Sequence, residues 1–136
     1  MKAVFADSFY FFSAVNASDP AHSKAIAFSA SFRGRLVTTG WVLTEFADGL
    51  ARPASNRSVF QQILGDLRAR PDTLIVPMTD QLLQQGIDLY TQRPDKEWSL
   101  TDCISFVVMT REGISEALTG DHHFEQAGFV ALLRTD

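Results

Sequence analysis

With 136 residues, 46% of them hydrophobic, the chain predicts one domain over residues 1–136 with an ordinary buried core. Its formal net charge of −4 does not indicate nucleic-acid binding by itself, and no apolar run approaches the roughly 18 residues of a membrane helix or the centre of a signal peptide. The single cysteine, Cys103, excludes an internal disulfide and a cysteine-rich zinc site, so we expect a reduced, cytoplasmic setting.

Hydrophobic runs and helix signals alternate along the chain. We expect strands at residues 2–6, 36–39, 73–76, 116–119 and 129–133. We expect helices at residues 9–15, 41–52, 55–70, 79–89 and 99–113, and one that Asp19 caps, with Pro20 in its first turn, running through residue 28. Strands separated by helices predict a mainly parallel sheet covered on both faces, an α/β fold.

Four acidic residues fall where such a sheet gathers its functional groups. Asp7 follows the first predicted strand and Asp121 the fourth, while Glu45 and Asp102 lie in helices that begin near the sheet's carboxyl edge. In open parallel sheets, ligands bind at that edge. Carboxylates that converge in this way are typical ligands of hard divalent cations.

Each acid alone also has a structural explanation. Asp7 could end a strand and cap a helix, Glu45 could lie on an exposed helix stripe, and Asp121 could stabilise a turn. Asp102 follows Ser99 by three residues, which resembles a capping box. A chance placement of all four acids at one edge of the sheet is much less expected than a chance placement of any one of them.

Basic residues are segregated along the sequence. Residues 22–70 carry seven basic and three acidic residues, a net charge of +4, whereas the rest of the chain carries five basic and thirteen acidic residues, a net charge of −8. A basic region beside an acidic cluster suits a phosphate-bearing substrate that approaches bound cations. The alternative is that these arginines only solvate helix faces.

Other chemistries have weaker support. A zinc site at His122 and His123 is not expected, because adjacent side chains point in different directions and no Cys or suitably spaced His completes a tetrahedral set. Cys103 lies in an apolar helix, which favours a buried structural thiol over a nucleophile. Neither a glycine-rich phosphate loop nor a G-x-S-x-G elbow is present.

The order Asp, Glu, Asp, Asp and the strings around these residues resemble PIN-domain nucleases of the VapC type. The matching strings are residues 7–9, 38–45, 99–106 and 117–124, of which the last two are the most specific. The resemblance covers essentially the whole chain, although residues 53–93 carry little of the family signature. One position departs: the second residue after the first acid, often Asn or Ser in the family, is Phe9.

The resemblance implies a three-layer α/β/α sandwich and a metal-dependent ribonuclease, often the toxin of a VapBC-type pair. Asp7, Glu45, Asp102 and Asp121 would hold one or two Mg²⁺ or Mn²⁺ ions that hydrolyse RNA phosphodiesters. Thr119, Ser8 and Ser99 would orient these carboxylates or their waters. Three arginines of the basic region, Arg33, Arg35 and Arg52, would hold the RNA backbone.

Two alternatives remain open from the sequence. The chain could be a PIN-like module that only binds RNA or protein, or a nuclease that acts on flapped or single-stranded DNA. The partners implied are RNA, a small antitoxin protein and a second copy of the chain, without a membrane. The aromatic run at residues 9–12 is too long for one helix face to bury entirely, so we expect at least two rings in the core and part of the run at an antitoxin or subunit contact.

Overall fold

A five-stranded sheet with every strand parallel organises the chain, in the order β3-β2-β1-β4-β5. The computed structural model describes residues 1–135. The strands are β1 (Ala3–Ala6), β2 (Arg35–Thr39), β3 (Thr73–Val76), β4 (Glu116–Leu118) and β5 (Val130–Ala131). Most residues of β1 and β2 are buried, as expected for central strands covered on both faces.

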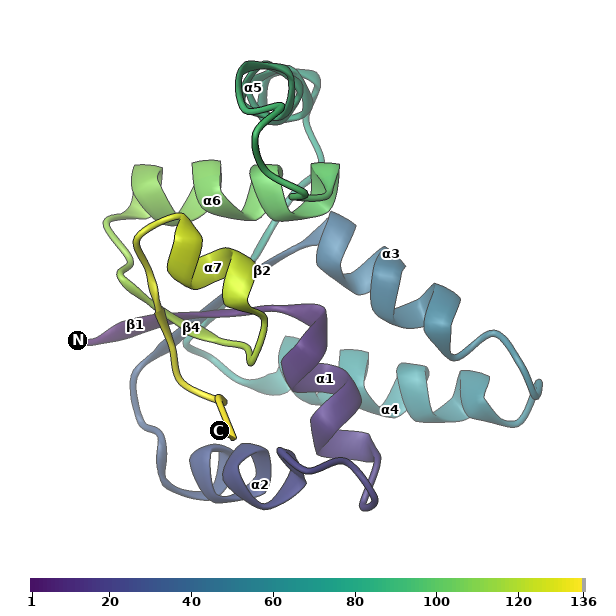
Figure 1. The fold of residues 1–136 in the computed structure, drawn as a ribbon. Helices are drawn as coiled ribbons and strands as arrows, with labels where there is room; N and C mark the ends of the chain where they lie inside the picture. The colour runs from purple at the N-terminus through teal and green to yellow at the C-terminus, as the bar shows by residue number, and fades with distance from the viewer. Residues whose placement is uncertain (136) are drawn as a thin grey trace.

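Helices cover both faces of this sheet and complete the predicted three-layer α/β/α architecture (Figure 1). On one side lie α1 (Ser8–Val15), α2 (His22–Ser31) and α4 (Asn56–Ala69), with α3 (Gly40–Gly49) packed against α1 and α4. On the other side lie α5 (Asp80–Gln92), α6 (Leu100–Glu112) and α7 (His122–Gln126). None of the helices within residues 1–135 is long and apolar enough to span a membrane.

Several predicted boundaries are confirmed by local chemistry. The Thr79 hydroxyl accepts a hydrogen bond from the Leu82 N–H and begins α5. Ser99 and Asp102 form a capping box at the start of α6, and Gly113 ends that helix in the left-handed conformation with φ 69°.

Other boundaries differ from the prediction. The Asp19 carboxylate accepts a hydrogen bond from the Ala21 N–H in a turn, so α2 begins only at His22. Helix α3 ends at Gly49 rather than at residue 52, and the last strand is only Val130–Ala131. Helix α7 was not predicted, because its five residues are too few to show a helical period.

Two aromatic clusters anchor the helices on each side of the sheet. Under α3, the Phe46 ring lies 5.4 Å from Phe11 and 5.1 Å from Phe12, measured between ring centroids. Under α6, the Phe106 ring lies 5.0 Å from Trp98 and 4.9 Å from Phe124. Phe11 and Phe12 therefore provide the core packing expected of at least two rings of the aromatic run, while a partner contact for that run stays a prediction.

The packing of α5 on α6 depends on a close approach at Gly86. A methyl group at Gly86 would overlap the Ile104 side chain, whereas a methyl group at Gly65 in α4 would meet nothing within 4 Å. We expect Gly86→Ala to lower the free energy of unfolding by about 1–3 kcal/mol through overpacking. We expect Gly65→Ala to raise it by about 0.5–1 kcal/mol through helix propensity. Urea denaturation of both variants tests this, and equal effects of the two substitutions would contradict it.

Candidate active site

A pocket of about 370 Å³ opens at the carboxyl ends of β1 and β4. We call it the acidic pocket, and its described lining consists of Asp7, Ser8, Phe9, Phe12, Glu45, Glu97, Ser99, Asp102, Asp121 and His123. All four predicted acids are therefore brought together. The described lining contains five carboxylates and neither lysine nor arginine, so the pocket has a strongly negative potential.

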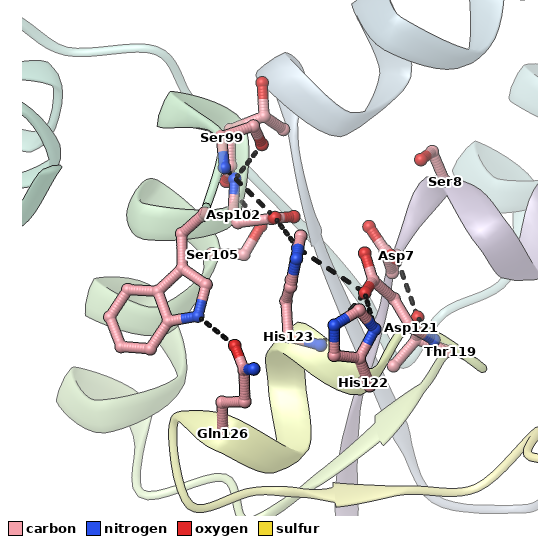
Figure 2. Close-up of polar contacts among 12 residues, drawn as sticks. Asp7, Ser8, Ser99, Asp102, Ser105, Thr119, Asp121, His122, His123 and Gln126 are labelled. Carbon is pink, nitrogen blue, oxygen red and sulfur yellow. Dashed lines mark hydrogen bonds and ion pairs between the residues drawn. The ribbon is translucent and has the colours of Figure 1, made fainter. Parts of the chain in front are cut away.

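Asp7 lies at the base of this pocket, where β1 ends and α1 begins. Its side chain is only 5% exposed, and Oδ2 accepts a hydrogen bond of 2.8 Å from the Thr119 hydroxyl (Figure 2). The pKa of the Asp7 carboxyl is raised to about 7, chiefly by burial; the Thr119 hydrogen bond lowers it, and the negative charges of Asp102 and Glu45 add to the rise. A cation in the pocket would favour the ionised form.

Glu45 lines the pocket from α3. It lies on the exposed side of that helix and accepts a hydrogen bond from the Ser8 hydroxyl. The backbone that carries it is fixed by Thr39, whose hydroxyl accepts the Val42 N–H and caps α3. Ser8 thus orients a pocket carboxylate, which is the contact that its predicted role requires.

Asp102 is held by the first turn of α6. Its Oδ2 accepts the Ser99 N–H at 3.2 Å, and the Asp102 N–H donates in return to the Ser99 hydroxyl at 3.0 Å. Burial raises the pKa of this carboxyl, the Ser99 N–H lowers it, and the negative charge of Asp121 raises it again. Capping therefore fixes the carboxylate in orientation without removing it from the pocket.

Asp121 caps α7 and carries two histidines beside it. Its Oδ1 accepts the His123 N–H at 2.9 Å, and its own N–H donates to the Thr119 hydroxyl at 3.1 Å. Contrary to the sequence-based expectation, the two imidazoles converge: their centroids lie 4.5 Å apart, and each Nδ1 lies near Asp121 Oδ1 (Figure 2). The prediction failed because it assumed that the two side chains diverge, whereas the Nδ1 atoms of both rings lie near the Asp121 carboxylate.

Two polar residues of the pocket were not among the predicted site residues. Glu97 lies in the polar loop before the Ser99 cap, and its only sequence signal was an acid two residues before a helix start. His123 Nδ1 lies 3.1 Å from Asp102 Oδ2. Its position in the string 117–124, two residues after Asp121, could have indicated a pocket residue.

The predicted RNA-binding arginines lie outside the acidic pocket. Arg35 opens β2, at the opposite edge of the sheet from the pocket. The Arg33 guanidinium donates to the carbonyls of Ala30 and Phe32, and Arg52 lies beyond the end of α3. Their contact with RNA stays a prediction.

Cys103 takes no part in the pocket's chemistry. It is buried, and burial followed by the negative charge of Asp102 raises the pKa of its thiol. A thiolate is therefore disfavoured, in agreement with the structural role expected for this residue.

The raised pKa of Asp7 has a consequence for stability. Because the folded-state pKa of about 7 exceeds the ordinary value of 3.8, the unfolded chain releases this proton first, and the protein loses stability as the pH rises from about 4 to about 7. In chelator-treated protein, we expect Asp7→Asn to raise the free energy of unfolding at pH 8 by up to about 4 kcal/mol, with little difference at pH 4. Urea denaturation at both pH values checks this, and a pH-independent difference between the proteins would contradict it.

The chain is similar to proteins of one kind in Mycobacterium tuberculosis. It is 28% identical over 127 residues to "23S rRNA-specific endonuclease VapC20" from strains CDC 1551 / Oshkosh and H37Rv, which covers 93% of this chain and 95% of the relative. The crystal structure of VapC20, described as a Sarcin-Ricin loop cleaving toxin, superposes with a TM-score of 0.81 over 93% of this chain and 96% of that one. No family model matches the chain. In sequence, fold and the order of its acids, the chain is similar to these VapC-type proteins.

Proposed function

We propose that this protein is a metal-dependent endoribonuclease that hydrolyses RNA phosphodiester bonds in the acidic pocket. The observation that carries the proposal is the convergence of five carboxylates, with neither lysine nor arginine in the described lining, at the carboxyl ends of β1 and β4. These strands are adjacent in the sheet although β2 and β3 come between them in the chain. The chain adds β2 and β3 on one side of β1 and then adds β4 on the other side, so the strand order reverses between β1 and β4. In open parallel sheets, ligands bind at the carboxyl ends of the strands where the order reverses.

The donor set fits a hard divalent cation. Carboxylate oxygens are the ligands that Mg²⁺ and Mn²⁺ prefer, and a positive neighbour would favour the ionised form of the buried Asp7 carboxyl, whose pKa is raised to about 7. Asp7, Glu45, Asp102 and Asp121 would hold one or two such ions. A bound ion supplies two effects: it lowers the pKa of a coordinated water and neutralises charge on the phosphate.

The chain's own residues keep these carboxylates in place. Thr119 is the central one, since its hydroxyl donates to Asp7 and accepts from the Asp121 N–H. Ser8 holds Glu45, and Ser99 holds Asp102. The arginines Arg33, Arg35 and Arg52 lie away from the pocket, so any contact they make is with RNA backbone remote from the hydrolysed bond.

The biological setting follows from the relatives. VapC20 is named as an rRNA-specific endonuclease and a toxin, so we propose that this chain is the toxin of a VapBC-type pair, with an antitoxin that covers the acidic pocket. Ribosomal RNA loops are the first substrates to test. A cytoplasmic location, where ribosomes and antitoxin are present, and a homodimer belong to the same proposal.

Asp102→Asn tests the nuclease directly. The amide oxygen can still accept the Ser99 N–H, so the cap and the fold should persist while one negative ligand is lost. We expect cleavage of labelled ribosomal RNA by purified protein to fall about 100-fold or more, and EDTA to abolish cleavage by the wild type. Asp88→Asn, an exposed carboxylate that accepts a hydrogen bond from Gln84 on α5, is the matched control and should remain fully active. Undiminished cleavage by Asp102→Asn, or indifference to EDTA, would rule out the mechanism.

Thr119→Val tests the positioning of Asp7. The substitution removes the hydroxyl that joins Asp7 to the Asp121 backbone at nearly constant volume, and we expect Mg²⁺ affinity to fall about 10–100-fold. Thr38→Val is the matched control, because Thr38 is equally buried but its hydroxyl donates to the Ala6 carbonyl rather than to a carboxylate. Calorimetric titration with Mg²⁺ separates the two, and an equal loss in both variants would assign Thr119 a purely structural role.

A further inference from the structure

We propose that Asp102, Asp121, His122 and His123 form a second metal site, which takes a zinc-class transition ion through nitrogen and oxygen ligands. We call it the histidine site. It shares Asp102 and Asp121 with the acidic pocket but uses neither Asp7 nor Glu45. A zinc-class ion bound there therefore competes with the Mg²⁺ or Mn²⁺ of the proposed nuclease for two carboxylates.

The distances match the requirements of a coordinated ion. His122 Nδ1 lies 3.6 Å and His123 Nδ1 3.5 Å from Asp121 Oδ1, while His123 Nδ1 lies 3.1 Å from Asp102 Oδ2. Metal–ligand bonds of about 2.0–2.1 Å at tetrahedral angles place ligand atoms about 3.3 Å apart. Asp121, His122 and His123 each offer one ligand atom, and these atoms lie within 4.8 Å of one another. Small rotations of these three side chains would suffice to bring their ligand atoms onto one ion, and Asp102, which lies beside His123, would have to turn toward that ion to complete the set.

Helix capping explains only part of this arrangement. The cap on α7 accounts for the Asp121 side chain, which accepts the His123 N–H. The His123 ring can be explained by its contact with Asp102. The His122 side chain, however, is 63% exposed and could extend into solvent, yet its Nδ1 lies near the same Asp121 oxygen that His123 approaches (Figure 2).

The ligand types separate the two sites chemically. Neutral imidazole nitrogens favour Zn²⁺, Ni²⁺ and Cu²⁺, whereas Mg²⁺ demands an octahedron of oxygens and keeps several of its waters. Two imidazoles and two carboxylates form a set of the kind that binds Zn²⁺, and the two negative charges neutralise the ion. Asp7 and Glu45 do not belong to this set. Their carboxylates give the acidic pocket a separate preference for hard ions such as Mg²⁺.

The site can be tested by isothermal titration of the full chain with Zn²⁺ and with Mg²⁺ as the only added ions. His122→Asn is the main variant, because this exposed side chain can change without disturbing the core. We expect it to weaken Zn²⁺ binding about tenfold or more and to change Mg²⁺ binding less than about twofold. Glu45→Gln should do the opposite and weaken only Mg²⁺ binding.

The third histidine provides the matched control. His22 lies on α2, and its Nδ1 is within hydrogen-bond distance of the Ser13 carbonyl, so His22→Asn should leave Zn²⁺ affinity unchanged. Equal Zn²⁺ affinity in His22→Asn and His122→Asn, or absence of Zn²⁺ binding to the wild type, would overturn the proposal and leave a histidine–carboxylate ion pair only. These titrations contain no RNA, so their outcome does not depend on whether the proposed nuclease activity is found.

Discussion

The burial of the Asp7 carboxylate is the constraint on which the rest of the pocket depends. An ionised group that is 5% exposed loses most of its hydration, and the Thr119 hydroxyl alone does not compensate for that loss, as the pKa of about 7 shows. The nearby charges of Asp102 and Glu45 increase the cost. A divalent cation removes both penalties at once. The arrangement is therefore costly for a structural carboxylate and suitable for a metal ligand.

Sheet topology explains how residues so distant in sequence meet. The chain builds β1, β2 and β3 outward in one direction and then returns to place β4 on the other side of β1. The helices before and after this reversal cover opposite faces of the sheet (Figure 1), and the acidic pocket opens at the ends of β1 and β4. Asp7 follows one of these strands, and Thr119 follows the other. Their hydrogen bond joins the two halves of the fold across 112 residues.

Much of the fold and the four acids could be predicted, because hydrophobic runs locate strands and each acid follows a strand or begins a helix. The histidine site could not, since the helix that carries the two histidines is too short to show a helical period, and the sequence alone does not give the directions of two adjacent side chains. The arginines illustrate a different limit. The basic residues cluster in the sequence, but the three predicted arginines do not lie beside the pocket. Arg35, for example, is at the amino end of β2, whereas the pocket is at the carboxyl ends of the strands.

The helices that carry the pocket are held from below by aromatic packing rather than by the pocket itself. Phe46 lies one residue after Glu45 and contacts Phe11 and Phe12, while Phe106, one turn after Asp102, contacts Trp98 and Phe124. Buried rings of this size contribute favourable energy that is independent of pH and of metal. Mutual repulsion among the carboxylates is thus opposed by contacts on the other side of the same helices. Because the acids are held in place by the fold, an ion that enters need not order them, which favours binding of the ion whose ligand preference matches the groups already present.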